Sequence, residues 1–280
     1  MTVLAHEVEE DEDLPAWSLP AAASESIRIR AGWPERVTRE WAWGDSTGEG
    51  VRVCVLDSGV ELDHPLVGRV ARSVAVTKTE DGIVVADDEA GDLCGHGTAC
   101  AGVIRSLAPE CEITSVRVLG AGYTGSAGVL LAGLEWAIDE GFDVVNMSLS
   151  TTKKQYVDRL HELADHAYFK RTILVASAHN MPVESFPWRF ASVLSVGSHE
   201  ATDPFAIYAN PRPPVEFFAR GLNVEVAWLG GGTITATGNS FATPHVAGVC
   251  ALVLGKHPEL TPFQLKSVLY LTASNVGGAR

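Results

Sequence analysis

The chain has 280 residues, 46% hydrophobic and 20% charged, a composition typical of a globular protein with one large domain. Its formal net charge of −14 at pH 7 argues against nucleic acid or an anionic membrane as a partner. Its longest apolar stretch, such as residues 246–254, is too short to span a bilayer.

The first 26 residues are acidic and then rich in Pro, Ala and Ser, with neither helical nor strand periodicity. We expect a mobile tail over 1–26 and one folded domain over 27–280. Residues 1–13 show neither the basic nor the apolar region of a secretory signal, so the predicted location is cytoplasmic. The five cysteines, an odd number, do not indicate a disulfide framework.

Strands and helices alternate along the rest of the chain. A helix is expected within 27–43, and then a β-branched run over 51–56 predicts a buried strand that ends at Asp57. Further strands are predicted at 111–118, 142–149, 172–176 and 191–196, and further helices at 98–106, 127–140, 154–170 and 240–254 and from 262 onward. This alternation predicts a three-layer α/β fold, a mainly parallel twisted sheet with helices on both faces.

Three polar residues stand among small neighbours that let a substrate backbone come close: Asp57 before Ser-Gly, His96 between glycines, and Ser240 after Gly-Asn. A serine hydroxyl attacks only when a base takes its proton, and histidine suits that role at neutral pH. An aspartate fixes the histidine tautomer and stabilises the imidazolium. We therefore assign Ser240 as nucleophile, His96 as general base and then acid, and Asp57 as orienting group.

The order Asp, His, Ser, with separations of 39 and 144 residues, resembles the subtilisin-like serine protease family over residues 45–275. The resemblance implies a serine endopeptidase working through an acyl-enzyme on a peptide or protein substrate. It also implies that Asn180, after the 172–176 strand, is the oxyanion-hole donor. His179 stands where relatives commonly carry glycine. The sequence alone specifies no oligomeric state.

In this family, substrate binds as an added β-strand between two edge segments. By resemblance these are Tyr123-Thr124-Gly125 and Ser148-Leu149-Ser150, with a serine at 150 where relatives usually have glycine. The alternative interpretation is a plain loop and a strand end. Glu184, in a short loop after Asn180, is expected to favour a basic side chain before the scissile bond, or else to be a solvated carboxylate.

No cofactor is expected. The loop that holds a strong calcium ion in secreted relatives is missing after the helix that follows His96, and Leu66 replaces one of their carboxylates. The sequence leaves room for a weak calcium or sodium site.

Two further departures concern the catalytic region. Asn239 replaces the threonine common before the nucleophile, and Cys100 lies one helical turn beyond His96. A thiol beneath the histidine is the functional interpretation of Cys100, and small-residue packing is the alternative.

The segments around His96 and Ser240 look most like subtilases that mature ribosomally made peptides by removing a leader. The predicted function is thus an intracellular processing protease. Two alternatives remain open: a general intracellular protease inhibited by its own tail, with residues 14–17 in the cleft, or a catalytically silent subtilase fold that serves as a binding module.

Overall fold

The computed structural model describes residues 15, 18–19 and 33–276, so the predicted tail over 1–26 lies almost wholly outside the described residues. By its internal contacts the chain divides into two compact units, residues 1–36 and residues 37–280. In the first unit, the backbone N–H of Ser18 donates to the carbonyl of Pro15. The second unit, from Val37 onward, contains every helix and strand described below.

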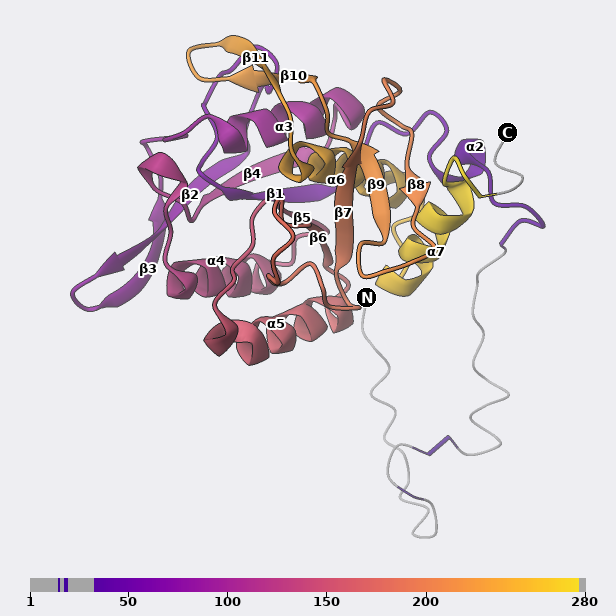
Figure 1. Cartoon of the computed structure of the whole chain (residues 1–280), viewed down its shortest axis with the longest axis horizontal. Coiled ribbons are helices and arrows are strands. Elements are labelled where there is room, and N and C mark those ends of the chain that lie inside the picture. Colours follow the sequence, from indigo (N-terminus) through magenta and orange to yellow (C-terminus); the bar gives the residue numbers. More distant parts are fainter. Residues whose placement is uncertain (1–14, 16–17, 20–32, 277–280) are drawn as a thin grey trace. The chain divides into compact units, whose positions relative to one another are not determined.

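The α-helices and strands of this unit, shown in Figure 1, are α2 (Arg39–Ala42), β1 (Arg52–Asp57), β2 (Arg72–Thr79), β3 (Gly82–Asp87), α3 (His96–Leu107), β4 (Glu112–Arg117), α4 (Ala127–Asp139), β5 (Val144–Met147), α5 (Val157–Phe169), β6 (Ile173–Ser177), β7 (Leu194–His199), β8 (Tyr208–Ala209), β9 (Phe217–Arg220), β10 (Val224–Trp228), β11 (Gly232–Ala236), α6 (Asn239–Lys256) and α7 (Pro262–Thr272). Two 3₁₀ turns, η1 (Ala121–Tyr123) and η2 (Lys154–Tyr156), precede α4 and α5.

Most strands join one sheet, in the order β3-β2-β4-β1-β5-β6-β7-β9-β8. Its central pairs are parallel, and the end pairs β2–β3 and β8–β9 are antiparallel. The predicted mainly parallel α/β sheet is confirmed. Strand β1 lies in the middle, and its residues from Val53 to Asp57 are buried, because both faces of the sheet are covered.

Helices cover both faces of the sheet (Figure 1). On one face α4 and α5 pack through residues such as Leu134 and Leu160, which belong to the main hydrophobic core. On the other face lie α3 and α6, which pack against each other. Helix α6 is buried from Phe241 to Leu254, which explains why its sequence is apolar all round rather than amphipathic.

The carboxyl ends of three adjacent parallel strands bring polar residues to one edge of the sheet. Asp57 ends β1, Ser148 follows β5, and Asn180 comes three residues after β6. In open α/β sheets this edge is where ligands and catalytic groups gather. The topology therefore places the candidate site there.

The structure corrects the helix predicted over 27–43. Residues 27–32 lie outside the described part, and of the remainder only Arg39–Ala42 is helical. Pro34 disfavours helical backbone in the residue before it. Thr38 caps a new start, where its hydroxyl accepts from the backbone N–H of Trp41.

No helix within the described residues is long and apolar enough to cross a membrane.

Candidate active site

Asp57 and His96 form a close hydrogen-bonded pair. The Nδ1 atom of His96 lies 2.8 Å from Oδ1 of Asp57 and 2.9 Å from Oδ2. Asp57 is fully buried, and the backbone N–H of Ser58 donates to its Oδ1 at 2.7 Å. With the Nδ1 proton held by the carboxylate, Nε2 of His96 is left to act as a base.

Pairing with Asp57 makes His96 more basic than an ordinary histidine. Burial of the ring, the largest effect, lowers the pKa of His96, but the charge and hydrogen bond of Asp57, together with the charge of Asp92, raise it above its ordinary value of 6.5. The net shift favours the imidazolium that forms when the histidine accepts a proton.

Asp92 organises the start of α3, a role that the sequence analysis missed. Its Oδ1 accepts from the Ser58 hydroxyl at 2.7 Å and from the backbone N–H of Gly95 at 2.9 Å. Its Oδ2 accepts from the backbone N–H and the hydroxyl of Thr98, at 2.8 and 2.6 Å. The N-cap residue of α3, Gly95, has no capping side chain, so the acceptors come from Asp92, three residues earlier, where the usual N-cap pattern gives no signal.

Glycine at 97 lets α3 approach the end of β1. A Cβ atom there would lie 2.0 Å from the Gly59 carbonyl oxygen and 3.2 Å from Cβ of Asp57. The backbone N–H of Gly97 instead donates to the Ser58 hydroxyl at 3.0 Å. The small residues around His96 thus serve the close approach of histidine and aspartate.

Ser240 is the second residue of α6, and its carbonyl is held by Ser148, which is in turn held by Asn146. The Ser148 hydroxyl donates to the Ser240 carbonyl at 2.8 Å, while Asn146 donates to Ser148 at 3.1 Å. The next residue, Phe241, has its ring 5.3 Å from that of His96. Ser148, predicted as part of a substrate-binding edge, therefore turns its side chain inward to support the nucleophile.

The Cys100 thiol lies between the triad aspartate and the nucleophile's backbone. Its Sγ is 3.9 Å from Oδ2 of Asp57, 3.3 Å from the Ser148 hydroxyl and 3.7 Å from the Ser240 carbonyl. Burial, followed by the charge of Asp57, raises the pKa of Cys100 well above its ordinary value. Because the thiolate is the reactive form, this thiol is suited to packing.

Asn180 lies beside the nucleophile, as an oxyanion-hole donor must. A Cβ placed on Gly238 would be 3.3 Å from Oγ of Ser240 and 3.4 Å from Nδ2 of Asn180, so both atoms flank Gly238. The Oδ1 of Asn180 accepts from the backbone N–H of Asn239 at 2.9 Å, which leaves Nδ2 as the donor available to a ligand. His179 uses its ring locally, because its Nδ1 accepts from the backbone N–H of Met181.

The two predicted substrate-binding segments meet in one hollow of about 130 Å³. It is lined from one side by Tyr123 and Gly125 and from the other by Leu149 and Ser150. Thr124 lies between the first two and pairs with Gly120, whose N–H donates to its carbonyl at 2.7 Å. Tyr123 is half-exposed and presents its ring edge-on to His96, with the centroids 5.9 Å apart.

Glu184 lines a different hollow, with His179, Arg189 and Asn239. Its carboxylate is 2.7 Å from Nζ of Lys154 and 2.8 Å from a guanidinium nitrogen of Arg189. Hydrogen bonding to Lys154, the larger effect, and the charges of both cations lower the pKa of Glu184. Two basic groups thus already compensate the charge that was predicted to attract a basic substrate residue.

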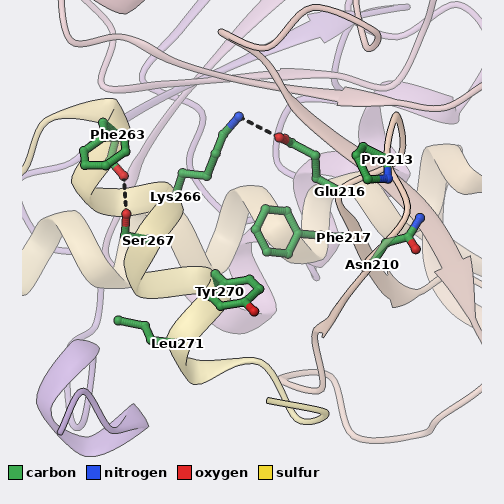
Figure 2. Close-up of a pocket in the computed structure, with 9 residues that line it drawn as sticks. All are labelled: Asn210, Pro213, Glu216, Phe217, Phe263, Lys266, Ser267, Tyr270 and Leu271. Carbon is green, nitrogen blue, oxygen red and sulfur yellow. Dashed lines mark hydrogen bonds and ion pairs between the residues drawn. The ribbon is translucent and has the colours of Figure 1, made fainter. Parts of the chain in front are cut away.

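A larger hollow of about 490 Å³ opens elsewhere, between α7 and the segment that leads into β9 (Figure 2). Phe263 and Tyr270 on α7 face Asn210 and Phe217 across it, and Lys266 forms an ion pair with Glu216 at 2.9 Å. None of the triad residues lines this hollow, so the chemistry assigned above does not use it.

Within the part of the chain that the structure describes, metal-ligand geometry gives no site separate from the triad. Three or more His, Cys, Asp or Glu side chains that lie close together can share an ion. Among the described residues there is one such group, Asp57, His96 and Cys100, and it belongs to the triad region. Helix α3 ends at Leu107 and β4 begins at Glu112, so the connection between them is short. Leu66 is half-exposed.

All five cysteines are free thiols, and Cys94 is the one that is not fully buried.

Comparison with known proteins agrees with this geometry. A family model described as the subtilase family, Peptidase S8, matches residues 48–280. The M-protease of Shouchella clausii strain KSM-K16 is 33% identical over 242 residues, which make up 82% of this chain and 61% of that protein. Subtilisin Savinase of Lederbergia lenta is 32% identical over 242 residues, 82% of this chain and 86% of that protein.

Among solved structures, the crystal structure of a cold adapted subtilisin-like serine proteinase matches with a TM-score of 0.68 and 31% identity. The match covers 84% of this chain and 87% of the other. Several curated relatives are longer, and this chain spans 61% of their length.

Proposed function

Because the chain belongs to the subtilase family and has the domain of a subtilisin-like serine endopeptidase, we propose that it hydrolyses a peptide bond through an acyl-enzyme on Ser240. The single observation that supports this most strongly is the buried Asp57 carboxylate held 2.8 Å from Nδ1 of His96, at the sheet edge where α6 presents Ser240.

The reaction follows from the roles of four residues. His96 takes the Ser240 proton as the oxygen attacks the carbonyl carbon of the substrate, and the imidazolium is stabilised by Asp57. The oxyanion that forms accepts from Nδ2 of Asn180 and from the backbone N–H of Ser240. His96 then gives its proton to the leaving amine, and water, activated by the same histidine, releases the acyl group.

We further propose that the substrate is one precursor peptide from which a leader is removed. The small volume of the hollow between the two cleft segments and the position of Tyr123 against His96 favour a selective cleft over a broad one. Five free thiols, four of them buried, fit a reducing intracellular compartment. Catalysis is proposed to need no metal ion.

The test begins with a fluorophosphonate, which reacts covalently with an assembled catalytic serine. Intact mass should show one adduct on the wild-type protein and none on Ser240→Ala. Absence of an adduct on the wild type, and also on a variant lacking residues 1–26, would contradict the peptidase proposal. An adduct that appears only after this deletion would favour inhibition by the tail.

Substrate range is tested separately, because an active triad does not define it. A selective processing enzyme should digest casein slowly and cut a peptide library at few sequences. Rapid, unselective casein digestion by the full-length protein would contradict the processing role while leaving the peptidase proposal intact.

A further inference from the structure

Asn239, which precedes the nucleophile, directs its side chain toward the segment that carries Asn180. Its Nδ2 donates to the carbonyl of Ala178 at 3.1 Å and to that of His179 at 3.4 Å. Its Oδ1 accepts from the Ser198 hydroxyl at 2.8 Å. One half-buried side chain therefore joins the start of α6 to the segment after β6 and to β7.

The backbone of the same residue controls how the Asn180 side chain is turned. The Asn239 N–H donates to Oδ1 of Asn180 at 2.9 Å. A carboxamide with its oxygen held in this way presents its NH₂ group elsewhere, and here Nδ2, like the Ser240 hydroxyl, lies next to Gly238. The backbone of Asn239 thus holds the Asn180 side chain, and its own side chain holds the backbone of Ala178, at the two ends of the segment 178–180.

We propose that Asn239 is a positioning residue that acts through Asn180: it holds this amide donor where the oxyanion forms. This inference rests on the proposed peptidase function. An oxyanion donor is effective only when it is preorganised at about 2.7–3.1 Å from the developing charge, so a loosened 178–180 segment weakens catalysis even though Asn180 is still present. Sequence alone indicated only that an asparagine replaces a threonine.

The first experiment measures how fast a fluorophosphonate modifies Ser240, with the maximal rate constant separated from the dissociation constant of the reversible complex. Asn239→Ala removes the side-chain bonds and keeps the backbone N–H. We expect its maximal rate constant to fall about tenfold, less than the roughly 10²–10³-fold loss for removing such a donor, with the dissociation constant unchanged. That larger value was measured on a subtilisin and is carried over to Asn180→Ala.

A double-mutant cycle then separates positioning from general packing. If Asn239 acts through Asn180, adding Asn239→Ala to Asn180→Ala lowers the rate constant by less than about twofold further, because the donor is already gone. If Asn239→Ala lowers the rate constant by the same factor in the wild-type protein and in Asn180→Ala, the inference is overturned. An unchanged rate constant in the single variant would overturn it too.

Two further variants keep the test independent of folding. Ser198→Ala removes only the hydroxyl that donates to Asn239 and should cause a smaller loss in the same direction; it replaces Asn239→Ala if that variant does not fold. Asn210→Ala is the matched control, because Asn210 also donates to two carbonyls, those of Arg212 and Val215, but lies in the hollow of Figure 2.

The control should lose thermal stability without losing labelling rate. Loss of rate in Asn210→Ala equal to that in Asn239→Ala would overturn the inference, since any loosened loop would then suffice. Failure of the wild-type protein to react at all would instead contradict the proposed function, and the inference with it.

Discussion

His96 alone is expected to set the pH dependence of the proposed activity. The general base must be neutral, so the rate rises as pH increases through the pKa of His96. Ring burial lowers this pKa, but the charge and hydrogen bond of Asp57 together with the charge of Asp92 raise it above 6.5, so we expect the acidic limb of the fluorophosphonate labelling profile to have its midpoint above that value.

Asp57→Asn should move that midpoint to lower pH, because the largest effect raising the pKa is removed. The same change should lower kcat by about four orders of magnitude, as the histidine tautomer is no longer fixed. Labelling rates from pH 5 to 9 for both proteins provide the measurement. A midpoint that stays in place would show that Asp57 does not set the His96 pKa.

At the residue level, prediction was possible where one short motif carries the chemistry. Asp57, His96 and Ser240 each stand in such a motif, and the structure brings Asp57 into hydrogen-bond contact with His96 and places Ser240 on the helix beside them. The role of Asn239 was missed because its partners, such as Ala178 and Ser198, lie far away along the chain. The role of Asp92 was missed because it stands three residues before the N-cap position of α3. Sequence spacing does not show which distant hydroxyl or carbonyl a side chain will meet.

At the scale of elements, the contact between α3 and β1 requires glycine at position 97. Gly97→Ala would push a Cβ into the Gly59 carbonyl oxygen, so we expect a loss of about 1–3 kcal/mol in unfolding free energy, the usual range for overpacking. Gly232→Ala in β11 is the control, because its Cβ would meet no atom closer than 3.9 Å. Urea titration measures both, and equal stability would contradict the close-contact argument.

We expect Asp92 to link the stability of the start of α3 to the proposed catalysis. Asp92→Ala removes acceptors for Thr98, Gly95 and Ser58, and we expect a loss of about 0.5–2 kcal/mol in unfolding free energy together with slower labelling of Ser240. Thr261→Ala removes the capping box of α7 and serves as the control. It should lose similar stability with unchanged labelling; slower labelling there would show that any weakened cap affects the site.

Two hairpins show the limits of element prediction. The hairpin β2–β3 and the hairpin β10–β11 were not predicted, because neither shows a regular alternation of exposed and buried residues. The outer strands β3 and β11 are mostly exposed and carry little periodic apolar signal, whereas buried strands such as β1 carry a strong one. The central sheet was therefore predictable and its margins were not.

For the molecule as a whole, we expect folding and activity to be independent of calcium. The short α3–β4 connection and the apolar Leu66 remove oxygen ligands that a strong site needs. The melting temperature and the labelling rate should be the same in EDTA and in excess calcium. A rise of several degrees in melting temperature with calcium would contradict the expectation, because a ligand that binds the native state stabilises it.

The separation of the triad along the chain has a consequence for biosynthesis. Ser240 stands on α6, which is buried against β5, β6, β7 and β9, while Asp57 ends the central strand β1. An all-apolar helix gains its stability from this packing, so the nucleophile takes its place only after those strands have paired. We therefore expect a chain still emerging from the ribosome to lack the proposed activity until α6 and these strands have been made and have packed together.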